Sequence, residues 1–172
     1  MSISLGFVFW GLLLVLMDFR IGGFDLLPDV IGHVLVAIGC GRLAGESGNF
    51  KVAIVLAVIL AVCALVPGAD LRVLQVPVLT ILEIWQVWYM LAGVMRMAEA
   101  RGLPEFALSA QRRRRDFLVV TALCVVLPQL YGGAWGREET SMVLSIILTV
   151  AGFVVAIRVL LVLHRGKARF GN

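Results

Sequence analysis

Apolar residues form six runs along the chain, and short polar stretches separate them. The runs cover residues 3–17, 27–44, 52–67, 74–96, 117–135 and 141–163. A helix needs about 20 apolar residues to cross about 30 Å of hydrocarbon, and most of the runs approach or exceed that length. They do not show the alternation of period two that the strands of an outer-membrane barrel have. The pattern predicts an all-α polytopic membrane bundle of six transmembrane helices, and similar endings of the second, fourth and sixth runs suggest three hairpins.

Composition excludes an ordinary soluble fold. Hydrophobic residues make up 61% of the 172-residue chain, against about 45–50% in soluble domains, and the mean hydropathy is +1.01. We therefore expect one integral membrane domain over residues 1–172. The first run has no basic residue before it and no small-x-small cleavage site after it, so we expect it to persist as a span. The three cysteines lie inside apolar runs without metal-site spacing, and no metal or cofactor is expected.

Lysine and arginine are divided unevenly between the two sides of the predicted bundle. The connections after the second and fourth runs, together with the C-terminal tail, carry eleven of them, and the other connections carry only three. Because positive charge is retained on the cytoplasmic side, we expect both termini in the cytoplasm. Arg158 lies inside the sixth run, about two turns from its inner end, and can snorkel to the cytoplasmic surface.

The longest connection, MAEARGLPEFALSAQRRRRDF, is cytoplasmic in this arrangement. We interpret its basic cluster, Arg112, Arg113, Arg114 and Arg115, as an orientation anchor. Each such residue near the membrane surface is worth about 1 kcal/mol of attraction to anionic lipid headgroups. A docking site for a cytoplasmic protein partner is the alternative. Nothing in the pattern indicates nucleic-acid binding.

Polar side chains are concentrated in the even-numbered runs, where they recur at helical spacing. The stripes are Asp25, Asp29 and His33, continued by the small residues Ala37, Gly41 and Gly45; Thr80, Glu83 and Gln86; and Ser141, Ser145 and Thr149. An ionised side chain that faces lipid near mid-bilayer costs about 2.5 kcal/mol or more. We therefore expect the even helices to form the interior. The third run should meet lipid over much of its circumference and pack closely through Ala53, Ala57 and Ala61.

The second run carries most of the candidate chemistry. Asp29 and His33 lie one helical turn apart on one face. With Glu83 and Gln86 they are predicted to form a polar site that opens outward and takes a small solute, an ion or a lipid headgroup. Asp25 is interpreted as the N-cap of this helix and as a further candidate ligand.

The connection before the second run is also rich in charge. Arg20 and Arg72 are predicted to lie at the outer rim of the site, where they can attract an anion or pair with the acids. Asp18, Pro28 and Gly32 are assigned a structural role in the loop and the first turns of the helix, where a proline is tolerated because its missing donor falls in the first turn.

The stretch LMDFRIGGFDLLPDVIG resembles a signature of small, uncharacterised bacterial multi-spanning membrane proteins, which reads approximately LDFRI-x-x-FD-LPD-IG. The match covers about seventeen residues. The resemblance implies a location in the bacterial cytoplasmic membrane, and it implies no particular activity.

Two functional hypotheses follow from these patterns. The first is binding or transport of a small solute, ion or lipid headgroup through an outward-facing polar cavity between helices. The second is a non-catalytic accessory or scaffold subunit with an Arg-rich cytoplasmic docking loop. A lipid-directed enzyme is less well supported, because the sequence lacks HExxH, GxSxG and the multi-aspartate pattern of phosphoalcohol transferases, and no catalytic residue is assigned.

Overall fold

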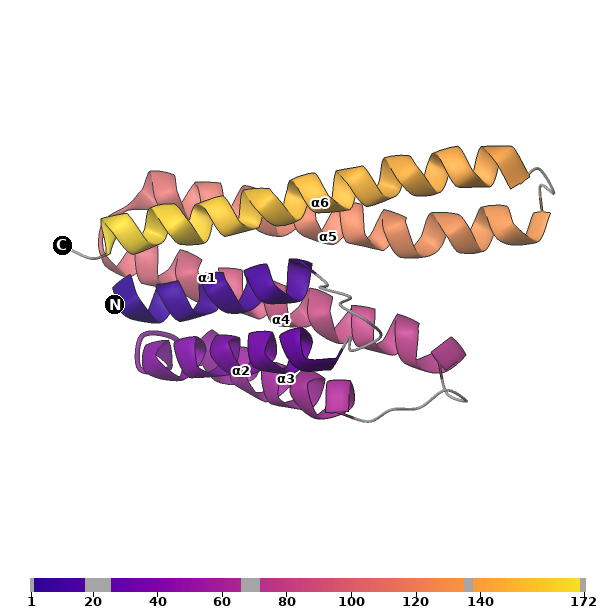
Figure 1. Ribbon diagram of the computed structural model, residues 1–172. Coiled ribbons are helices and arrows are strands. Elements are labelled where there is room, and N and C mark those ends of the chain that lie inside the picture. The colour runs from indigo at the N-terminus through magenta and orange to yellow at the C-terminus, as the bar shows by residue number, and fades with distance from the viewer. Residues whose placement is uncertain (1, 18–25, 66–71, 135–137, 171–172) are drawn as a thin grey trace.

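Six α-helices make up the part of the chain that the computed structural model describes, residues 2–17, 26–65, 72–134 and 138–170. The helices are α1 (Ser2–Met17), α2 (Leu26–Leu43), α3 (Gly48–Leu65), α4 (Arg72–Ala100), α5 (Pro104–Ala134) and α6 (Glu138–Arg169). Each helix packs against its neighbours in the chain, and α6 returns to pack against α1, so the bundle closes as a ring (Figure 1). This confirms the all-α fold class.

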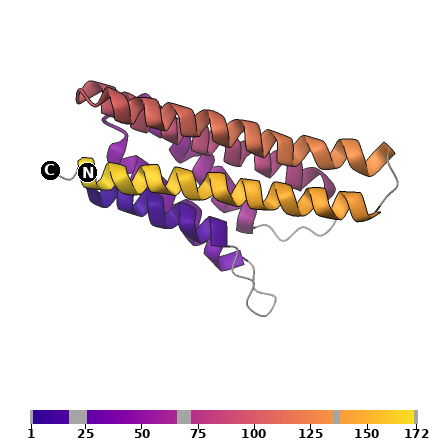
Figure 2. The same ribbon diagram turned by 90° about the horizontal axis from the view of Figure 1, so that it is seen from above.

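Both termini lie at one end of the bundle, together with the α2–α3 turn at residues 44–47 and the α4–α5 turn at residues 101–103 (Figures 1 and 2). We call this the basic end. Lysines and arginines of the described residues gather in the helix ends and turns here: Arg42, Lys51, Arg96, Arg101, Arg165, Lys167 and Arg169. At the opposite end, α5 and α6 project beyond α1, α2 and α3 (Figure 1).

Three helices are long and apolar enough to cross a membrane, judged within the described residues. They contribute the segments Gly48–Leu65, Val78–Ala100 and Ile146–Arg169, and Ser2–Leu16 is a shorter apolar helix. The predicted set of six spans is therefore matched by six helices, of which three meet the length and hydropathy of a full span. Membrane association follows from these three.

Large apolar side chains cover the outside of the ring. On α3, Val55 and Val62 are 58% and 55% exposed, and on α6 Ile147 and Val150 are both 58% exposed. Exposed apolar surface of this extent is rare on soluble monomers and is suited to contact with acyl chains. The opposite edge of α3 is buried and includes Ala53, Ala57 and Ala61, which confirms the predicted packing edge.

The α1–α2 contact does not use Gly41 and Gly45, the glycines that continue the Asp29–His33 stripe. Gly41 and Gly45 are exposed, and a Cβ atom built on either would meet nothing within 4 Å. Instead, a Cβ on Gly32 would lie 2.7 Å from the carbonyl oxygen of Gly11, and a Cβ on Gly39 would lie 2.7 Å from that of Ser4. The helices approach this closely because glycine has no side chain to hold their backbones apart.

The long Arg-rich connection is helical, which corrects its prediction as a loop. Only residues 101–103 separate α4 from α5. Gly102 has φ +68°, its N–H donates to the carbonyl of Glu99, and the N–H of Leu103 donates to the carbonyl of Ala98. These two bonds form a Schellman cap, and Pro104 then occupies the first position of α5, where its fixed φ favours a helix. The basic cluster is carried by the early turns of α5 as a result.

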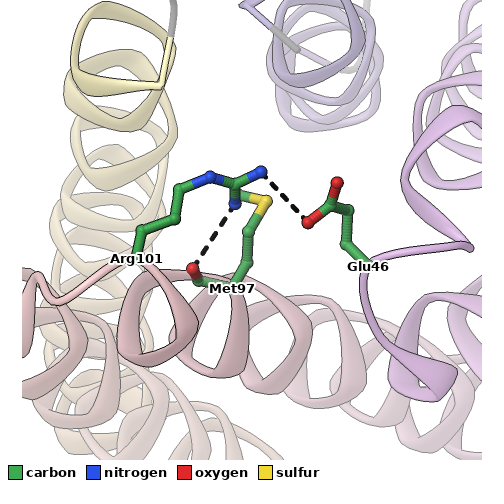
Figure 3. A network of polar contacts seen from close by, with 3 residues as sticks. All are labelled: Glu46, Met97 and Arg101. Carbon is green, nitrogen blue, oxygen red and sulfur yellow. Dashed lines mark hydrogen bonds and ion pairs between the residues drawn. The ribbon is translucent and has the colours of Figure 1, made fainter.

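Arg101 joins this turn to the rest of the basic end. Its guanidinium donates to the carboxylate of Glu46 in the α2–α3 turn at 3.0 Å and to the carbonyl oxygen of Met97 at 3.4 Å (Figure 3). It also lies 5.3 Å from the ring centroid of Phe170. One side chain thus connects three segments that are distant in the sequence.

The closely packed core occupies the half of the bundle next to the basic end. Its fully buried members come from all six helices and include Leu5, Val36, Leu43, Phe50, Met90, Leu91, Met97, Ala110 and Leu163. Phe50 packs so tightly against α4 that a Cβ on Gly93 would lie 2.7 Å from its ring. The candidate site lies directly beyond this core.

Candidate functional site

A cavity of about 650 Å³ opens among five of the six helices, α1, α2, α4, α5 and α6. Its walls are largely apolar and include Leu12, Val15, Leu16, Leu79, Val87, Phe117, Val159 and Leu160. Cavities that bind small molecules have this size and character, with a few polar groups set into an apolar lining.

The polar groups of the lining come mainly from α2 and α4. Asp29 and His33 lie one turn apart on α2, and Thr80, Glu83 and Gln86 recur every three residues on α4. Because each set shares one helix face, the packing of α2 and α4 into the same ring brings both sets to one space. Four of the predicted site residues, Asp29, His33, Glu83 and Gln86, therefore line a single cavity.

Two of these side chains are buried with a nitrogen atom that has no hydrogen-bond partner. His33 is 4% exposed and its Nδ1 is unpartnered, and Gln86 is 1% exposed and its Nε2 is unpartnered. A buried polar atom without a partner costs about 1–3 kcal/mol, so native structures seldom leave one unsatisfied. Both atoms belong to residues that line the cavity, and an occupant of the cavity would supply the missing bonds.

The charges of the lining are acidic. Asp29 and Glu83 are half-buried and lie within electrostatic range of each other. Among the described residues that line the cavity there is no lysine or arginine. Two carboxyl groups and an imidazole in a largely apolar enclosure can bind a cation or exchange protons with an occupant.

The other predicted site residues are placed differently. Arg20, Asp18 and Asp25 lie outside the described residues, and Arg72 and Pro28 are helical residues of whose side chains nothing is described. Gly32 contacts α1 as part of the close α1–α2 contact. The cluster Arg112 to Arg115 lies on α5, apart from this cavity.

The structure adds wall residues that the sequence pattern did not indicate. Phe117 and Thr121 on α5 lie one turn apart and face the cavity, as do Gly152 and Ala156 on α6. The helices α1 and α5 thus contribute to the interior beside the even-numbered ones. The sequence could have indicated only that Phe117 and Thr121, at i and i+4, share one face of a helix. That this face borders the cavity follows from the arrangement of the helices.

Metal binding has no support from the described side chains. Within residues 2–17, 26–65, 72–134 and 138–170, no group of three or more His, Cys, Asp or Glu residues is placed to hold a metal ion.

Comparisons with protein-family models, curated proteins and solved structures find no match to the chain. The functional argument therefore depends on the geometry of the cavity alone.

Proposed function

We propose that this chain is an integral membrane protein that binds a small cationic solute in the cavity between its helices and moves it across the membrane. One observation supports this most. The same cavity is lined by two residues that each bury a nitrogen without a hydrogen-bond partner, His33 (Nδ1) and Gln86 (Nε2), and by two acidic residues, Asp29 and Glu83. A fold that needed these residues only for packing would seldom leave two polar atoms unsatisfied beside one cavity.

The preference for a cation is based on the composition of the lining. The two carboxyl groups favour positive charge, and the apolar wall formed by residues such as Phe117 and Leu160 favours hydrocarbon groups on the same solute. Unpartnered buried groups on the protein give a site its selectivity, because a solute without matching polar atoms leaves them unpaired. An organic cation with at least one hydrogen-bonding group satisfies all three features.

The membrane arrangement is part of the proposal. All six helices cross the bilayer, the basic end faces the cytoplasm, and the cavity lies beyond the core towards the outer face. The excess of lysine and arginine at the basic end supports this orientation, and the signature around Asp18 to Gly32 favours a bacterial inner membrane. Helices as short as α1, with 16 residues, require local thinning of the bilayer.

Binding of a graded series of organic cations that each carry a hydroxyl group, from ethanolammonium to choline and its N-benzyl analogue, tests the proposal. The purified chain in detergent should bind at least one of them, and Glu83→Gln or Asp29→Asn should weaken that binding about tenfold or more, because each removes a charge from a partly desolvated site. Glu99→Gln is the matched control, since Glu99 is an exposed acid on the same helix outside the cavity.

The same variants should lower uptake of the bound cation into reconstituted vesicles while leaving the thermal unfolding temperature close to that of wild type. The proposal is wrong if no cation of the series binds, or if the chain with both substitutions binds as tightly as wild type.

A further inference from the structure

A second hollow lies between α5 and α6, and it shares no lining residue with the polar cavity. Its volume is about 410 Å³. Arg112, Arg115 and Asp116 on α5 face Arg158 on α6 across it, and Val119, Val120 and Val155 form the rest of the lining. Arg158 is thus gathered at one place with two arginines that precede it by more than forty residues in the sequence.

The positive charge of this hollow is not neutralised by the protein. Asp116 is the one acidic residue of its lining, and its carboxylate already accepts a hydrogen bond from Arg113 at 3.0 Å. Among the described residues, Arg112, Arg115 and Arg158 form no ion pair with a carboxylate. Like charges held together repel one another, so the cluster is stable only with an anion bound to it or with strong solvation.

The surroundings of Arg158 disfavour solvation alone. Arg158 lies eleven residues before the end of α6, which is about 16 Å of axial rise, and the neighbouring outward residues Val154, Ile157 and Leu161 are exposed apolar side chains. Snorkelling explains how one arginine at this depth reaches polar groups. It does not explain why Arg112 and Arg115 of another helix converge on the same hollow.

We propose that this hollow binds the phosphate of an anionic phospholipid headgroup, with the acyl chains lying along the exposed apolar face of α5 and α6. Guanidinium groups hold phosphate oxygens through paired, charge-assisted hydrogen bonds. Basic pockets between membrane helices near the cytoplasmic side are sites for such headgroups. The valines of the lining, Val119 and Val155 among them, suit the first carbons of the lipid tails.

Native mass spectrometry of the purified chain with phosphatidylglycerol and phosphatidylcholine in equimolar mixture tests this inference. Wild type should retain phosphatidylglycerol in preference to phosphatidylcholine. Arg158→Gln should reduce the apparent affinity for phosphatidylglycerol about fivefold or more, which is the effect expected for one headgroup-contacting arginine. Arg165→Gln, an exposed arginine on the same helix outside the hollow, is the matched control and should bind like wild type.

Two further measurements keep the outcome clear if Arg158→Gln folds poorly. Arg158→Lys keeps the charge and should lose only part of the affinity, because lysine cannot form the paired geometry, and Arg112→Gln should weaken binding from the α5 side. Retention of the lipid in excess inorganic phosphate supports a lipid headgroup, and displacement by inorganic phosphate would overturn that assignment. Equal losses in Arg158→Gln and Arg165→Gln, or no preference between the two lipids, would overturn the site itself.

Discussion

The guanidinium of Arg114 lies over the indole of Trp88, with its central carbon 3.4 Å from the ring centroid. This contact joins α5 to α4 on the side of the polar cavity nearest the basic end, because Gln86 and Val87 of the cavity directly precede Trp88. Arg114 is half-buried and its Nε has no partner. The ring face of Trp88 is therefore its main stabilising neighbour among the contacts described.

Trp88→Leu should destabilise the protein by about 1–2 kcal/mol, because it removes a partly desolvated cation–π contact. A double-mutant cycle with Arg114→Gln, measured by thermal unfolding in detergent, should show that the two side chains stabilise the protein together, with a favourable coupling energy between them. Trp85→Leu is the matched control: Trp85 is 54% exposed on the same helix, and its replacement should have little effect. A coupling energy of zero would show that the two side chains act independently.

The close approach of α1 and α2 gives a second prediction. A Cβ on Gly39 would lie 2.5 Å from a methyl group of Val8 and 2.7 Å from the carbonyl oxygen of Ser4. Gly39→Ala should therefore push the helices apart and cost about 1–3 kcal/mol, as other overpacking substitutions do. The measurement is the midpoint of thermal or denaturant-induced unfolding in detergent.

Gly41→Ala is the control for this prediction, because the new Cβ would meet nothing within 4 Å. It should leave stability unchanged or raise it by up to about 1 kcal/mol through helix propensity. If Gly39→Ala were as harmless as Gly41→Ala, the α1–α2 contact described above would be incorrect.

The sequence predicted the existence and type of every helix, and it predicted their ends unevenly. The ends of α1 and α2 agree with their apolar runs to within one residue. The start of α5 was placed at residue 117, yet the helix begins at Pro104, because hydropathy cannot detect a helical segment that is basic on one side and buries Phe106 and Ala110 on the other. Local signals were present all the same, since Gly102 and Pro104 are typical of a helix end followed by a helix start.

The candidate site was predictable to the extent that it depends on helix periodicity. The spacing of Asp29 and His33, and that of Glu83 and Gln86, placed each pair on one face before any tertiary arrangement was known. Which faces meet is a tertiary property, and the sequence did not indicate that Gly32 and Gly39 would be the glycines of α2 in contact with α1. In the structure, Gly32 and Gly39 contact α1, and with α2 in this rotation Asp29 and His33 line the cavity.

The α4–α5 turn gives a third prediction. Gly102 has φ +68°, a conformation that costs a residue with a Cβ about 1–2 kcal/mol. Gly102→Ala should lower stability by about that amount, and Gly102→Asn should lower it less, because asparagine tolerates the left-handed region better. Gly45→Ala, in the exposed α2–α3 turn, is the comparison: its Cβ would have open space. The midpoint of thermal unfolding should be lowest for Gly102→Ala, higher for Gly102→Asn and highest for Gly45→Ala. Equal midpoints for Gly102→Ala and Gly45→Ala would contradict the Schellman cap.

The orientation of the bundle gives the last prediction, tested in a chain whose three native cysteines are replaced by alanine. Gly45→Cys places a thiol in the exposed turn at the basic end. Because seven of the described lysines and arginines gather at that end and positive charge is retained in the cytoplasm, a membrane-impermeant maleimide should label this thiol only after the membrane is opened. Gly68→Cys, in the connection after α3, should be labelled in intact cells. The reverse pattern would place the basic end outside, and then the polar cavity would lie towards the cytoplasm and the arginine hollow would face the outer leaflet.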